Sequence, residues 1–155
     1  RNAYPYFNNG AKVKKFAFTS PEETKSFAAS YAKEAPNGQI IALIGNLGAG
    51  KTTFSQGFAL GLGVEESVIS PTFKLVSEYH GKRILNHIDC YRLDSSNDFL
   101  NIGGENFLSC ENGITIIEWA DRIKDIWLDD WIIIYFDRDE NDSNIRHIKI
   151  TGNNQ

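Results

Sequence analysis

The chain has 155 residues, of which 41% are hydrophobic and 23% are charged, and its formal net charge is −4. This composition predicts one globular domain with its own core, and it argues against a membrane-spanning helix because no apolar run approaches the roughly 20 residues that a span requires. The acidic balance also argues against a protein that grips nucleic acid by bulk charge.

The cysteines and histidines do not suggest a metal centre. Cys90 and Cys110 match neither a zinc motif nor a disulfide framework, and we see no signal peptide, so we expect a reduced, cytoplasmic protein. The three histidines are scattered without metal-ligand spacing, and we interpret all of them as structural: His80, His87 and His147.

The N-terminal segment carries no clear pattern. The chain begins at Arg1 and contains no methionine. We therefore expect residues 1–12 to be a terminal arm, either disordered or added for expression, and residues 13–152 to form the domain.

A strand and a helix are expected to open the domain. Residues 13–19 alternate between apolar and polar side chains, which predicts a strand. Ser20 then has the properties of a helix cap, Pro21 suits the first helical position, and Glu23 completes a capping box. The turn residues at 36–38 are expected to end this helix.

Residues 45–52 read Gly-Asn-Leu-Gly-Ala-Gly-Lys-Thr and match the phosphate-binding motif G-x-x-x-x-G-K-[ST]. Glycines let the backbone come close to a polyphosphate, and the N–H groups of the loop and of the next helix point at its oxygens. Lys51 would add positive charge beside the β- and γ-phosphates, and the Thr52 hydroxyl would ligate Mg²⁺. The apolar run at 39–44 predicts a buried strand before the loop, and residues 53–60 predict a helix after it. The loop residues expected to contact a nucleotide are Asn46, Leu47, Gly48, Ala49, Gly50, Lys51, Thr52 and Thr53.

The rest of the chain predicts further strands and short helices. We expect strands over 73–79, 83–89, 114–117, 131–136 and 145–151, and short helices within 94–112 and 121–126. The first two strands and the last two are expected to form hairpins. The predicted fold is therefore a single α/β domain, a P-loop NTPase fold with a mixed central sheet flanked by helices.

A phosphate-binding loop needs carboxylates to support the metal and to orient water. Asp89 and Glu118 each end a predicted strand and are the two candidates, and the spacing leaves open which lies nearer the metal. Thr72, in a Ser-Pro-Thr turn, has the residue type of a switch that senses the γ-phosphate, although alone it would be an ordinary turn residue. Trp119 would cover the site, meet a partner or pack in the core.

Taken together, these segments resemble the bacterial TsaE family over nearly the whole chain. The matching segments, in order, are residues 45–53, Ser-Pro-Thr-Phe-Lys-Leu-Val at 70–76, His-Ile-Asp-Cys-Tyr-Arg-Leu at 87–93, and Ile-Glu-Trp at 117–119. The resemblance implies a small ATPase that uses ATP and Mg²⁺ and works with the TsaD and TsaB proteins. These proteins make threonylcarbamoyladenosine in tRNAs that read codons starting with A, and ATP hydrolysis is expected to reset the complex between turnovers.

The resemblance also implies roles for individual residues. Lys51 and Thr52 match the family's phosphate and magnesium residues, and Thr72 matches its switch-like threonine. Asp89 matches the Walker B acid, which would act on the metal. A further acid–tryptophan pair, Glu118 and Trp119, matches residues that the family uses near the nucleotide. Which acid orders the attacking water stays open.

Because no arginine finger is evident, we expect ATP hydrolysis to be weak in the isolated chain and to depend on the partners, with tRNA reached only through the complex. Two other functions remain open. One is a small-molecule kinase, although no arginine-rich lid is evident between residues 94 and 112. The other is a nucleotide-switched binding module in which hydrolysis is incidental.

Overall fold

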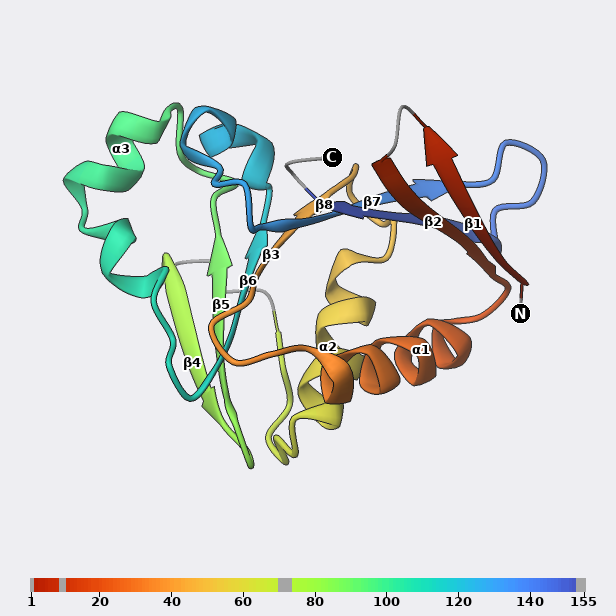
Figure 1. Ribbon diagram of the computed structural model, residues 1–155, viewed down its shortest axis with the longest axis horizontal. Coiled ribbons are helices and arrows are strands. Elements are labelled where there is room, and N and C mark those ends of the chain that lie inside the picture. The colour runs from red at the N-terminus through yellow and green to blue at the C-terminus, as the bar shows by residue number, and fades with distance from the viewer. Residues whose placement is uncertain (1, 9–10, 70–73, 153–155) are drawn as a thin grey trace.

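The computed structural model describes residues 2–8, 11–69 and 74–152, with side chains described from residue 13 onward. Its frame is one mixed sheet of eight strands in the order β1-β2-β8-β7-β3-β6-β5-β4 (Figure 1). The strands are β1 (Asn2–Asn8), β2 (Ala11–Phe18), β3 (Ile40–Ile44), β4 (Val76–His80), β5 (Ile84–Asp89), β6 (Gly113–Glu118), β7 (Ile132–Arg138) and β8 (Arg146–Gly152). The predicted α/β class is confirmed.

Helices cover both faces of this sheet (Figure 1). They are α1 (Pro21–Glu34), α2 (Lys51–Gly61), α3 (Ser96–Asn101) and the 3₁₀ helices η1 (Gly104–Phe107) and η2 (Ala120–Ile126). Helices α1 and α2 pack on one face, whereas α3 and η2 lie on the other. Among the described residues, no helix is both long and apolar enough to cross a bilayer.

Strand β3 is the centre of the fold because it runs parallel to both of its neighbours, β6 and β7. Its side chains alternate between two hydrophobic clusters. Ile41 and Leu43 join the cluster under α1 and α2, and Ile40 and Ala42 join the cluster under α3 and η2. A strand buried on both faces is apolar throughout, which is why residues 39–44 carry a continuous apolar run.

Both predicted hairpins are present, since β4 pairs antiparallel with β5 and β7 with β8. The predicted strand at 73–79 is described only from Val76 onward, because residues 70–73 lie outside the described part. The expected short helices are also found, as α3, η1 and η2.

The segment expected to form a loose arm contains strand β1, which pairs antiparallel with β2. The sequence in this stretch suits an edge strand, because it contains Tyr and Phe, which favour strands. Pro5 lacks an N–H group, and an edge strand tolerates such a gap in its ladder. Where the domain itself begins stays a prediction.

Helix α1 begins as its sequence indicates. The Ser20 hydroxyl accepts a hydrogen bond from the Glu23 N–H at 3.1 Å, which satisfies one of the free donors of the first turn. The Glu23 carboxylate in turn accepts from the Thr19 N–H at 2.7 Å, one residue earlier than the usual capping box. The helix start is thereby fixed beside the end of β2.

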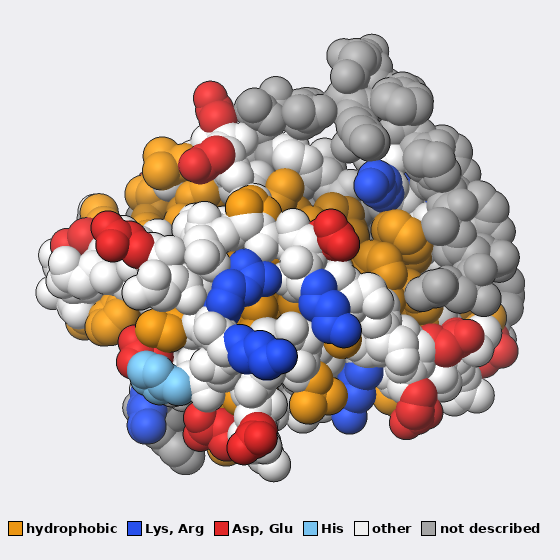
Figure 2. All heavy atoms as spheres, turned by 60° about the horizontal axis from the view of Figure 1, so that its bottom comes forward, with side chains coloured by type: hydrophobic (Ala, Val, Ile, Leu, Met, Phe, Trp, Pro, Cys, Tyr) orange, Lys and Arg blue, Asp and Glu red, His pale blue; other side chains and the backbone are white. Residues whose placement is uncertain are grey.

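The other end of α1 is held by an arginine from the β4–β5 hairpin. The Arg83 guanidinium donates to the carbonyl oxygens of Ala35, at 2.6 Å, and Ala32, and to Asn37 Oδ1 at 3.0 Å. A cation at a helix C-terminus satisfies free carbonyls and favours the helix dipole. Figure 2, in which the bottom of Figure 1 is turned toward the viewer, shows several Lys and Arg side chains gathered near the middle of that face of the molecule.

Helices α1 and α2 approach so closely that Gly57 has no room for a side chain. A Cβ there would lie 2.5 Å from both the Cα and the carbonyl oxygen of Lys25. Because these are backbone atoms, we expect Gly57→Ala to destabilise the fold by about 1–3 kcal/mol. In an unobstructed helix the same change would stabilise by nearly 1 kcal/mol.

Urea unfolding measures this difference directly. Leu60→Ala is the matched control, because Leu60 lies on the same helix and is 61% exposed, so it should change stability by less than about 0.5 kcal/mol. A more stable Gly57→Ala variant would contradict the close contact between α1 and α2.

Candidate functional site

The phosphate-binding motif forms the connection between β3 and α2, as predicted. Gly48 and Gly50 have φ values of +76° and +112°, which glycine adopts without the steric cost that other residues incur. Gly45 is needed for a different reason, because a Cβ there would lie 2.7 Å from the carbonyl oxygen of Phe136 on β7. The glycine spacing therefore serves the folding of the loop itself.

Lys51 begins α2 and is only 5% exposed. Its Nζ donates to the carbonyl oxygens of Gly45 and Asn46, the latter at 3.2 Å, and lies 4.3 Å from the centre of the Trp119 ring. Burial lowers the pKa of Lys51, and the charges of Glu118 and other nearby acids oppose that shift. The amine is thus folded back onto its own loop, next to acidic side chains.

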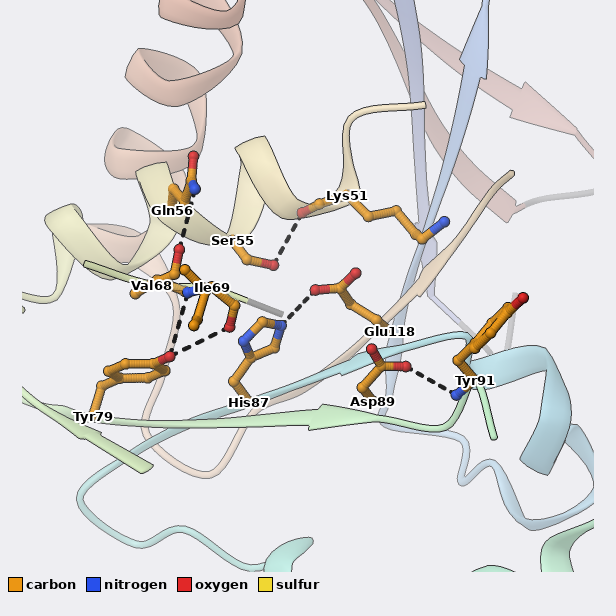
Figure 3. Close-up of polar contacts among 10 residues, drawn as sticks. All are labelled: Lys51, Ser55, Gln56, Val68, Ile69, Tyr79, His87, Asp89, Tyr91 and Glu118. Atoms are coloured by element: carbon orange, nitrogen blue, oxygen red, sulfur yellow. Dashed lines mark hydrogen bonds and ion pairs between the residues drawn. The ribbon is translucent and has the colours of Figure 1, made fainter. Parts of the chain in front are cut away.

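Those acids end two neighbouring parallel strands. Asp89 closes β5 and Glu118 closes β6, and the two are paired in the β5–β6 register. Figure 3 shows both side chains on the side of the sheet that faces the start of α2. Asp89 Oδ1 accepts from the Tyr91 N–H at 2.9 Å. Burial raises the pKa of Asp89, and the negative charge of Glu118 adds to the shift.

A histidine that we had interpreted as only structural joins this group. His87 Nε2 lies 2.5 Å from Glu118 Oε2, and the two side chains are 0% and 3% exposed. His87 sits two residues before Asp89, on the same face of β5. The sequence did not indicate this contact, because spacing within β5 does not reveal the register with β6.

Trp119 follows Glu118 with a φ of +56°, the single described non-glycine residue with positive φ. A bulky residue in this region is strained, and such strain is most often found at functional sites. The ring lies between the Lys51 amine and Tyr91, whose ring centre is 4.9 Å away. Trp119 therefore lies beside the loop and also packs against the hydrophobic cluster under α3 and η2, and a role in covering a ligand stays a prediction.

These elements enclose a cavity of about 600 Å³ above the N-terminus of α2. The predicted site residues that line it are Leu47, Gly48, Gly50, Lys51, Thr52, Thr53, Asp89, Glu118 and Trp119. Three positively charged residues also line it, and no sequence motif predicted that they would lie together: Lys74, Arg92 and Arg146. The cavity therefore combines positive side chains on its rim with two carboxylates on its floor.

Two predicted residues do not line this cavity, and a third lies outside the described part of the chain. Ala49 is buried in the core, so it can offer a ligand only its backbone. Asn46 lines a second cavity, on the other side of the loop, and its described link to the site is its carbonyl oxygen, which Lys51 contacts. Thr72 lies outside the described residues, and its role stays a prediction.

The residues present suit a nucleoside triphosphate with Mg²⁺. Burial, and to a smaller extent the charge of Glu118, raise the pKa of Asp89, and a divalent cation bound there would favour the ionised carboxylate. Among the described residues, no three His, Cys, Asp or Glu side chains converge on a metal position. In phosphoryl-transfer sites Mg²⁺ takes one or two protein ligands and completes its shell with phosphate oxygens and water.

Comparison with protein families and curated proteins gives one consistent result. Residues 18–148 match the family model described as threonylcarbamoyl adenosine biosynthesis protein TsaE. The chain is similar to tRNA threonylcarbamoyladenosine biosynthesis protein TsaE from Treponema pallidum, with 40% identity over 67% of this chain and 76% of the relative. The protein of the same name from Bacillus subtilis is also 40% identical, over 74% of this chain and 71% of the relative.

A solved structure agrees with these sequence matches. The crystal structure of YdiB from Bacillus subtilis superposes with a TM-score of 0.78 and 33% sequence identity, covering 94% of this chain and 88% of YdiB. The likeness therefore extends over the sheet and helices as a whole and is not limited to the glycine loop.

Proposed function

This chain belongs to the TsaE family of tRNA threonylcarbamoyladenosine biosynthesis, and we propose that its part in that pathway is Mg²⁺-dependent ATP hydrolysis together with TsaD-like and TsaB-like proteins. Hydrolysis would reset the complex between turnovers. The modified tRNAs would be those that read codons starting with A. The protein would reach tRNA only through its partners, in keeping with its net charge of −4.

One observation carries the proposal: a single cavity joins the phosphate-binding loop to two paired carboxylates. The loop N–H groups and the N-terminus of α2 would hold the phosphates. Lys51 would exchange its bonds to the loop carbonyls for bonds to phosphate oxygens, and there it would offset charge that builds up during transfer.

The remaining polar side chains of the cavity would either hold the metal or orient the water. The Thr52 hydroxyl and Asp89 would hold Mg²⁺, Asp89 directly or through water. Bound Mg²⁺ would neutralise charge on the β- and γ-phosphates. Glu118 would orient the attacking water, because its carboxylate is buried and fixed by His87.

We expect the isolated chain to turn over slowly. The Lys51 amine is already engaged by two carbonyl oxygens of its own loop, so catalysis requires the loop to rearrange. Partner binding would favour the active arrangement.

Phosphate release from ATP, with no other acceptor than water, tests the function. It should be measured for the chain alone and with TsaD and TsaB from the same organism. We expect the pair to accelerate release by at least about tenfold, because completing a phosphoryl-transfer site in trans has large effects. Equal rates with and without the pair would contradict the partner assignment, and release only after adding a small-molecule acceptor would indicate a kinase.

A further inference from the structure

We propose that His87 is a positioning residue for ATP hydrolysis: it holds one oxygen of Glu118 so that the other oxygen can orient the attacking water. The inference rests on the proposed function, because it assigns Glu118 to the water. It concerns a side chain that neither the motif nor the family match assigns to the reaction.

The contact between the two side chains is short and buried. His87 Nε2 lies 2.5 Å from Glu118 Oε2, and neither side chain is more than 3% exposed. A carboxylate only accepts hydrogen bonds when it is ionised, so the ring nitrogen is the donor. In a site without competing water, such a charge-assisted bond fixes the carboxylate plane.

The imidazole ring has no second hydrogen-bond partner among the described residues. Its Nδ1 is buried and unpartnered, so the ring is not a member of a wider polar network. Since its one polar contact is with a carboxylate that lines the cavity, the ring is suited to orienting that group.

The strands explain why the ring reaches Glu118 and not Asp89. His87 and Asp89 lie on one face of β5, and Asp89 is the residue that pairs with Glu118 in register. Because His87 precedes Asp89 by two residues, its ring approaches Glu118 from the side opposite the end of β5. Figure 3 shows the ring on the side of Glu118 away from the Lys51 amine. Asp89 is fixed separately, by the Tyr91 N–H.

Two substitutions separate positioning from packing. His87→Leu fills similar space but removes the donor, and we expect kcat for ATP to fall about 10- to 100-fold, as for other residues that orient an active-site ligand. The KM for ATP should stay within about twofold, because His87 touches no nucleotide-binding group. His87→Gln keeps an amide N–H near the Nε2 position and should recover most of kcat.

Leu85→Val is the matched control. Leu85 is buried on the same face of β5 but is paired with Ile114, away from Glu118. It should lower stability without lowering kcat. If His87→Leu does not fold, His87→Asn takes its place, since that shorter amide cannot reach Glu118 whereas His87→Gln can.

A double-mutant cycle shows whether His87 acts through Glu118. In a Glu118→Gln background, His87→Leu should lower kcat little further. In an Asp89→Asn background, His87→Leu should lower kcat by the same factor as in the wild type. Full additivity with Glu118→Gln would overturn the proposal.

A measurement on the nucleotide-free protein is independent of activity. The histidine Nε2 proton should give a strongly downfield NMR resonance that Glu118→Gln shifts and His87→Gln removes. If that resonance is unaffected by Glu118→Gln, or if His87→Leu leaves kcat unchanged in a protein that hydrolyses ATP, the inference fails while the proposed function stands. A wild-type chain that hydrolyses no ATP, alone or with its partners, would instead contradict the proposed function.

Discussion

Lys51→Ala should reduce ATP turnover by at least about a hundredfold, because an electrostatic group aimed at developing charge contributes strongly in a site shielded from water. The amine starts α2, is buried, and lies within reach of the loop that would hold the phosphates. Nucleotide affinity should fall as well, since the charge acts on the ground state and on the transition state.

Lys14→Ala is the control for the loss of one positive charge, because Lys14 is exposed on β2. It should leave turnover and affinity unchanged. Phosphate release and calorimetric binding of ATP measure the two effects separately. A Lys51→Ala variant that kept most of its turnover would contradict the assignment of the site to the loop.

Glu118→Gln should lower kcat by about 10²- to 10⁴-fold while ATP affinity changes little, because the amide keeps the shape of the side chain but loses the charge that orders water. Asp89→Asn should act differently. Its main effect should be a higher Mg²⁺ concentration at half-maximal rate, since Asp89 is proposed to hold the metal.

Titrating Mg²⁺ at saturating ATP separates these two roles. Asp121→Asn is the control, since Asp121 is an exposed acid whose charge also acts on Lys51, and it should have little effect. If Asp89→Asn abolished turnover at every Mg²⁺ concentration while Glu118→Gln was rescued by added metal, the two roles would have to be exchanged.

The local parts of this molecule could be predicted because their signals are local. The glycine motif specified the loop, and Ser20 with Pro21 specified the start of α1. Apolar runs gave the central strands because β3 and β6 are buried on both faces. The hairpins followed from polar turns between strands that are close in sequence.

The non-local parts could not be predicted in the same way. Nothing near His87 indicates that it meets Glu118, because that contact depends on the register of β5 with β6. Arg146 reaches the cavity from β8, far along the chain from the loop, and no motif marks it. Ala49 follows Gly48 in one motif, yet its side chain belongs to the core, because the direction of each side chain depends on the turn of the loop.

The strand order has a consequence for the synthesis of this protein. Strand β3 carries the nucleotide loop, but its two sheet neighbours, β6 and β7, come much later in the chain. Pairing of residues so distant in sequence is slow, because the loop-closure entropy must be overcome first. On the ribosome, the loop would emerge long before the strands that hold it in place. The loop would therefore take its final form only near the end of translation, and until then the apolar strand β3 would be exposed to aggregation.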